Sequence, residues 1–107
     1  FIEAGVEVVT VRRAPGGGLM PRAMLAALAA RGVTRVLAEC GGALAAALLR
    51  AGLVDRLAWF HAPALLGGDA RAALDALGIA RLPAMPRFRV LRRDAAGADT
   101  FTEFEKE

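Results

Sequence analysis

The order of its apolar segments constrains the fold of this chain more than any other feature. Short segments rich in valine alternate with alanine-rich segments in which leucine and methionine recur at helical spacing. The expected strands cover residues 6–11, 33–39 and 56–63, and the expected helices cover residues 21–32 and 43–52. Strand–helix–strand order with short connections is typical of right-handed βαβ units, whose strands are parallel.

The last third of the chain follows a different pattern. Residues 70–78 (ARAALDALG) predict a short helix, and residues 87–107 predict two strands around an Asp/Gly/Ala turn, a β-hairpin. No linker or internal repeat divides the 107 residues, a common length for one domain. We therefore expect one α/β domain over residues 1–107, with a mainly parallel sheet, flanking helices and a C-terminal antiparallel hairpin.

The composition and the first residues of the chain indicate where in the cell the protein is expected. Hydrophobic residues make up 56% of the chain and the mean hydropathy is +0.43. No apolar run reaches the ~18 residues that a membrane-spanning helix needs. The opening FIEAGVEVV lacks the features of a secretory signal, so we expect a cytoplasmic protein without a membrane partner. The chain also opens without Met, directly in strand-like sequence, from which we expect a truncated or processed chain.

Charge and the rare residues exclude further classes. The net charge is +3 and the pI about 10.4, but the arginines are scattered singly or in pairs, without interleaved aromatic residues. We therefore expect no nucleic-acid partner. A single Cys excludes an internal disulfide, and one Cys with one His cannot form a Cys/His zinc site, so we expect no metal.

The stretch AECGGALA marks the most promising site, because it joins an expected strand to an expected helix. In open α/β sheets, ligands bind beyond the carboxyl ends of the strands. Gly41 and Gly42 leave the backbone accessible, and the free N–H groups of a helix N-terminus attract phosphate. Glu39 would accept hydrogen bonds from a ligand. The alternative is a tight corner alone, since the stretch is neither GxGxxG nor a P-loop.

Other reactive residues have plainer interpretations. Cys40 could be a nucleophile at the helix N-terminus, but no base lies near it in sequence, and we favour a small buried residue. His61 could face the same crevice, or bond to backbone at the end of its strand. Asp69, in the second Gly-Gly turn LLGGDA, could cap the helix expected after it, or face a ligand. The catalytic residues stay unknown.

Read in order, AECGGALAAALL, AGLVDRL, WFHAP and LLGGDA resemble one known family. It is the C-terminal reductase domain of the bifunctional riboflavin-biosynthesis deaminase/reductase, which has a dihydrofolate-reductase-like fold. The resemblance runs from GVEVV to FTEFE, and it implies the C-terminal half of that domain. The chain departs from the family pattern at Cys40, where Gly or Ala is usual, and at Ala43, where Thr is frequent.

The resemblance implies an NADPH-dependent reductase that acts on a ribosylaminopyrimidine phosphate, a small-molecule substrate. Because a partial sheet would expose an edge, which pairing with another copy would bury, we also expect a homodimer. The resemblance places the substrate-binding glutamate at Glu39. The isolated chain is expected to be inactive, since the family domain is longer. The alternative is a non-catalytic α/β remnant or oligomerisation module. The resemblance places cofactor contacts at Gly41, Gly42, Ala43, Leu44, Ala45, Ala46 and Ala47.

Overall fold

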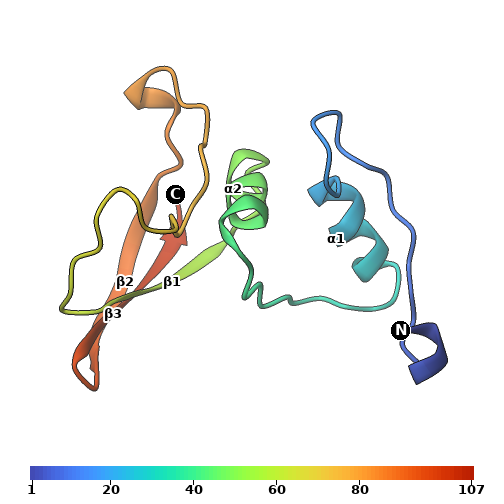
Figure 1. Cartoon of the computed structure of the whole chain (residues 1–107), viewed down its shortest axis with the longest axis horizontal. Helices are drawn as coiled ribbons and strands as arrows, with labels where there is room; N and C mark the ends of the chain where they lie inside the picture. The colour runs from blue at the N-terminus through green and yellow to red at the C-terminus, as the bar shows by residue number, and fades with distance from the viewer. The chain divides into compact units, whose positions relative to one another are not determined.

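The structure is a computed structural model that describes all residues from 1 to 107 (Figure 1). The chain divides into two compact units, Phe1–Glu39 and Cys40–Glu107. None of its helices is long and apolar enough to cross a membrane. The expectation of a single domain over residues 1–107 stays a prediction.

The first unit contains a 3-10 turn, η1 (Ile2–Ala4), and one helix, α1 (Pro21–Ala29). Pro21 is the first residue of α1, where its fixed φ suits a helix and its missing N–H costs nothing. The expected stop follows at Gly32, whose φ of 82° is accessible mainly to glycine. The first helix is therefore confirmed, three residues shorter than the pattern predicts at its end.

The two strands expected in this unit are not formed, so this part of the prediction is wrong. Residues 7–11 and 34–39 make no backbone–backbone hydrogen bonds, and the single bridge of the unit joins Arg13 to Leu19. A β-branched segment becomes a strand only where a second segment satisfies its N–H and C=O groups. Its apolar side chains accordingly stay exposed, as Val8 (58%) and Leu37 (82%) show.

The second unit holds helix α2 (Gly42–Arg50), the 3-10 turn η2 (Leu82–Ala84) and a three-stranded sheet. The strands are β1 (Arg56–His61), β2 (Phe88–Ala96) and β3 (Asp99–Lys106). β3 lies in the centre and pairs antiparallel with both neighbours, so the order is β1-β3-β2. The C-terminal hairpin is confirmed, but the mainly parallel sheet is not observed, because the strands that would run parallel have no partners here.

One face of this sheet shares a cavity with α2. Phe88 and Lys106 are directly paired across β2 and β3, so they share a face, and both line a cavity together with Leu49 of α2. Alternation along β3 places Thr102, which is 5% exposed, on that same face. On α2 the buried residues are Ala46, Leu48 and Leu49.

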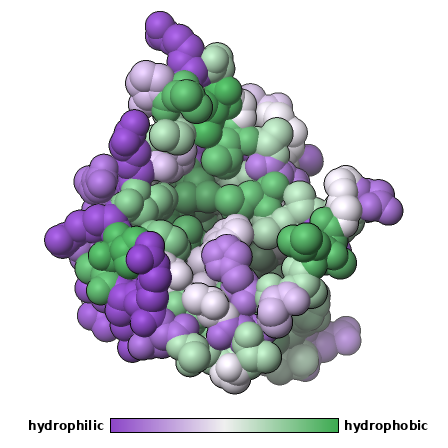
Figure 2. All heavy atoms as spheres, turned by 90° about the vertical axis from the view of Figure 1, so that its left-hand side faces the viewer, coloured by the Kyte–Doolittle hydropathy of each residue, from purple (hydrophilic) through white to green (hydrophobic).

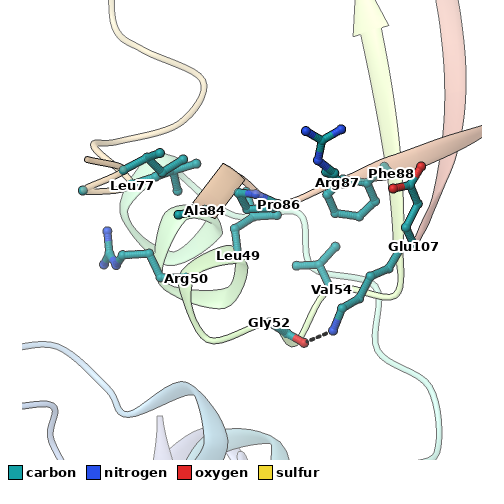
Figure 3. Close-up of a pocket in the computed structure, with 13 residues that line it drawn as sticks. Leu49, Arg50, Gly52, Val54, Leu77, Ala84, Pro86, Arg87, Phe88 and Glu107 are labelled. Carbon is teal, nitrogen blue, oxygen red and sulfur yellow. Dashed lines mark hydrogen bonds between the residues drawn. The ribbon is translucent and has the colours of Figure 1, made fainter. Parts of the chain in front are cut away.

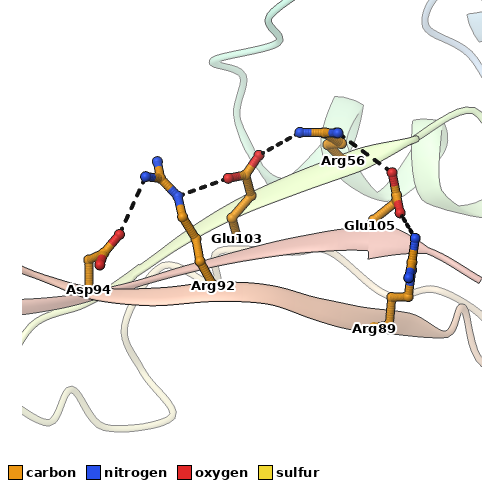
Figure 4. Close-up of polar contacts among 6 residues, drawn as sticks. All are labelled: Arg56, Arg89, Arg92, Asp94, Glu103 and Glu105. Atoms are coloured by element: carbon orange, nitrogen blue, oxygen red, sulfur yellow. Dashed lines mark hydrogen bonds and ion pairs between the residues drawn. The ribbon is translucent and has the colours of Figure 1, made fainter.

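The other face carries a continuous chain of ion pairs (Figure 4). Glu103 of β3 binds Arg56 of β1 at 3.1 Å and Arg92 of β2 at 3.0 Å, so one carboxylate links all three strands. Glu105 likewise lies between Arg56 and Arg89. Exposed ion pairs contribute little to stability individually. The same face also carries the rings of Phe60 and Phe101, whose centroids lie 4.9 Å apart.

The prediction of a helix over residues 70–78 is also wrong, because the structure has none there. Asp69 therefore has no helix to cap. Helices this short are marginal without tertiary support, and the segment instead bonds to α2. The Asp75 N–H donates to Gly42 O at 3.3 Å, and Arg50 Nη1 donates to Ala76 O at 2.6 Å. The preceding turn stays open, with Leu65 fully exposed, and Figure 2 shows apolar surface reaching solvent.

Candidate functional site

The N-terminus of α2 is built as the sequence predicts, with its backbone donors free. Gly41 is the N-cap, with φ −71° and ψ 168°, and the first helical bond runs from Ala45 N to Gly41 O at 3.1 Å. No side chain caps the helix. The N–H groups of residues 42–44 therefore lack partners in the chain, and they carry the positive end of the helix dipole.

A cavity of about 290 Å³ opens at this helix end, entirely within the second unit. Both glycines of the turn contribute to its wall, and the segment after β1 contributes one cation and one carboxylate. The lining residues are Cys40, Gly41, Gly42, Ala43, Leu44, Arg71 and Asp75.

The two glycines of the turn have different reasons to be glycine. A Cβ atom on Gly42 would lie 2.8 Å from Asp75 Oδ1, 3.1 Å from Asp75 N and 3.2 Å from Ala72 O. These distances are shorter than van der Waals contact, so Gly42 permits the close packing of the segment against α2. A Cβ atom on Gly41 would meet no protein atom within 4 Å. Gly41 therefore keeps the cavity open without being needed for internal packing.

Arg71 and Asp75 also line the cavity, although no motif in the sequence indicates them as site residues. The Arg71 guanidinium is exposed and makes no ion pair or hydrogen bond within the chain, so all its donors are available to a ligand. Asp75 is fixed beside Gly42 by its own backbone N–H. The only sequence signal was that an Arg and an Asp follow LLGG in a segment that resembled a plain helix.

The residues predicted to bind cofactor lie only partly at the cavity. Gly41, Gly42, Ala43 and Leu44 line the cavity, whereas Ala45, Ala46 and Ala47 lie further along α2. Ala46 is 0% exposed, so a ligand cannot touch it. Glu39 is exposed and directly precedes Cys40 in the chain.

Cys40 and His61 are not brought together. Cys40 is half-buried and lines the cavity, but His61 is exposed at the end of β1 and does not line it. The nearest aromatic neighbour of the His61 ring is Trp59, with centroids 6.0 Å apart. The thiol therefore has no imidazole base, and the cavity offers binding groups rather than a nucleophile–base pair.

Comparison with known proteins identifies the family. The family model of the RibD C-terminal domain matches residues 3–101, so the chain belongs to that family, and the predicted resemblance is confirmed. The Riboflavin biosynthesis protein RibD of Escherichia coli (strain K12) is 40% identical over 67 residues, which cover 63% of this chain and 18% of that protein.

Solved structures agree with this assignment. Two structures of Acinetobacter baumannii RibD, form 2 and form 1, superpose with TM-scores of 0.81 and 0.80 at 25% identity. Each match covers 99% of this chain and 28% of the other, so the chain spans under a third of the length of these relatives. The α/β fold class is thereby confirmed.

The different roles of the two glycines lead to a stability prediction. Gly42→Val should lower the free energy of unfolding by about 1–3 kcal/mol, because the added atoms overpack the contact with residues 72–75. Gly41→Val should cost less than about 1 kcal/mol, the loss of a favoured N-cap residue. Urea unfolding followed by circular dichroism measures both.

The double variant Gly42→Val/Asp75→Ala provides the control. Removing the Asp75 carboxylate takes away the closest of the three contacts, so part of the lost stability should return. If Gly41→Val is the more destabilising of the two changes, the assigned packing at Gly42 is wrong.

Proposed function

We propose that this chain forms part of an NADPH-dependent 5-amino-6-(5-phosphoribosylamino)uracil reductase of riboflavin biosynthesis, working in the cytoplasm. Such an enzyme reduces the ribosyl group of a ribosylaminopyrimidine phosphate to a ribityl group. The observation that carries the proposal is the cavity with free N–H groups at the start of α2, in a chain of the RibD C-terminal domain family.

The proposed reaction needs positioning more than reactive side chains. NADPH, when bound, would supply the hydride for C1 of the ribosyl group. Reduction at C1 would require cleavage of the bond from C1 to the ring oxygen and a proton for that oxygen. The protein then has to hold the nicotinamide close to C1 of the substrate in an orientation that permits hydride transfer. A cavity without a nucleophile–base pair suits this role, and we assign no proton donor among these residues.

The cofactor is proposed to lie against the first turn of α2. Backbone N–H groups from residues 42–44 would bind a phosphate group, as helix N-termini do in other nucleotide sites. Arg71 lines the same cavity and would pair with a second negative charge. The proposed cofactor contacts are Gly41, Gly42, Ala43 and Leu44, which line the cavity. Ala45, Ala46 and Ala47 lie further along α2 and would contribute only by forming the helix whose first turn binds the cofactor.

Glu39 is proposed as the substrate contact. Its carboxylate is exposed, has no ion-pair or hydrogen-bond partner in the chain, and directly precedes the turn in sequence. An ionised carboxylate accepts hydrogen bonds only, so it suits the hydroxyl or amino groups of a ribosylaminopyrimidine.

Cofactor binding can be tested on the 107-residue chain by NMR. We expect weak binding of NADPH, with Kd no tighter than about 1 mM, and no turnover. The amide shifts should concentrate at residues 41–47. Gly41→Val should weaken binding at least tenfold, about 1.4 kcal/mol, because its side chain enters the open cavity.

Arg71→Ala distinguishes which phosphate the arginine binds. Loss of affinity for NADPH alone would indicate the 2′-phosphate, and equal loss for NADH would indicate the pyrophosphate. Arg93→Ala, an exposed arginine on β2 outside the cavity, is the matched control. Shifts away from residues 41–47 would contradict the proposed cofactor site. Micromolar binding with turnover would instead show that the 107-residue chain is active by itself.

Glu39→Gln tests the substrate role. The exchange preserves size but removes the charge, so kcat/KM for the pyrimidine should fall about tenfold while the cofactor Kd changes less than twofold. The assay uses E. coli RibD with its matching segment replaced by this chain, after the unaltered chimera has been shown to be active. Equal loss for substrate and cofactor, with the fold intact, would remove Glu39 from the substrate site.

We also propose that the chain associates as a homodimer through a sheet edge. β1 and β2 are the edge strands, and edges carry unpaired backbone groups. At the bulge of β2, Val90 and Leu91 remain 42% and 38% exposed. Pairing β2 with a second copy would bury both.

Analytical ultracentrifugation tests this association. The chain should sediment as a dimer at high concentration, and Leu91→Lys, which places a charge at the edge, should shift it to the monomer. A monomer at every concentration would exclude the homodimer. It would also exclude the alternative function, a non-catalytic oligomerisation module, while leaving the reductase proposal standing.

A further inference from the structure

A second cavity, of about 340 Å³, lies within the second unit at the opposite end of α2 (Figure 3). It opens beside the last residues of the helix, and its walls come from the segment after β1 and the start of β2. The volume falls at the lower end of the ~300–1,000 Å³ typical of small-molecule pockets. The apolar lining residues are Leu49, Val54, Leu77, Ile79, Ala84, Pro86 and Phe88.

Three cationic side chains and one acidic side chain form the charged part of the lining. Arg50 Nη1 donates to Ala76 O at 2.6 Å, and Lys106 Nζ donates to Gly52 O at 2.7 Å, so both heads are held by backbone at the cavity. Arg87 makes no ion pair. With Glu107 as the one acidic side chain, the four charged side chains sum to +2 at neutral pH, and the terminal carboxylate of Glu107 in the 107-residue chain reduces the surplus to +1. Each cation keeps donors that a ligand can use.

The helix dipole does not cancel this positive charge. The C-terminus of α2 carries a partial negative charge from its free carbonyl groups. The following turn satisfies several of them, with bonds from Ala51, Gly52 and Leu53 to carbonyls of the last turn. The Lys106 ammonium on Gly52 O adds a full positive charge at the same end.

We propose that this cavity binds a small apolar anion, an aromatic body carrying one negatively charged group. The apolar walls favour the body, and the surplus of positive charge favours the anionic group over a neutral or cationic one. The site is separate from the proposed cofactor turn, because Gly42 and Arg50 lie at opposite ends of α2, about 12 Å apart along the helix axis.

The test uses 8-anilinonaphthalene-1-sulfonate as the anionic probe and N-phenyl-1-naphthylamine as its neutral counterpart. NMR titration of the 107-residue chain should move the amides of residues 49–54, 77–79 and 88. Arg87→Glu should weaken binding of the sulfonate about tenfold and leave the neutral amine within twofold. Arg93→Glu, with the same charge change on β2 outside the cavity, should affect neither probe.

A second variant distinguishes binding in the cavity from nonspecific binding to exposed apolar surface. Ile79→Trp fills the space between the walls and should abolish binding of both probes without changing the far-ultraviolet spectrum. The proposal is overturned if Arg87→Glu and Arg93→Glu weaken the sulfonate equally, or if the shifts scatter over the exposed apolar surface. NADPH shifts at residues 41–47 report on the reductase proposal alone, so the two can fail independently.

Discussion

The packing of residues 72–75 against the first turn of α2 is the contact on which both cavities depend. Asp75 bonds to Gly42 at the beginning of the helix, and the next residue, Ala76, accepts from Arg50 at its end. These two consecutive residues therefore connect the irregular segment after β1 to both ends of α2. The segment then supplies Arg71 and Asp75 to one cavity, and Leu77 and Ile79 to the other.

Elements with a strong local signal could be predicted from the sequence. Pro21 marks the start of α1, the alanine–leucine run forms α2, and the turn near Gly97 (φ 66°) joins the strands of the hairpin. Residues 6–11 and 33–39 have an equally strong local signal, yet they form no strands, because pairing depends on partners that a local pattern does not specify. The helix predicted over residues 70–78 is wrong for a similar reason, because hydrogen bonds to α2 take the place of hydrogen bonds within a helix.

In the candidate site, too, the features set by local sequence could be predicted, whereas those set by tertiary contacts could not. The Gly-Gly pair before the alanine-rich segment located the start of α2 correctly, but the sequence could not distinguish the two glycines. Gly42 is required by an approach from residues about thirty positions away, and Gly41 is not required by the protein at all. Arg71 could not be assigned for the same reason, because only the tertiary contact at Asp75 brings its segment to the start of α2.

Charge placement explains why the basic composition says little on its own. The arginines on the outer face of the sheet are neutralised by Glu103, Glu105 and Asp94, which link the three strands. Arg71 and Arg87 make no such pair, and each lines a cavity at one end of α2. A net charge of +3 therefore arises from arginines with unlike surroundings. What determines a binding role is the absence of an internal partner beside a cavity, and that is a property of the fold rather than of the composition.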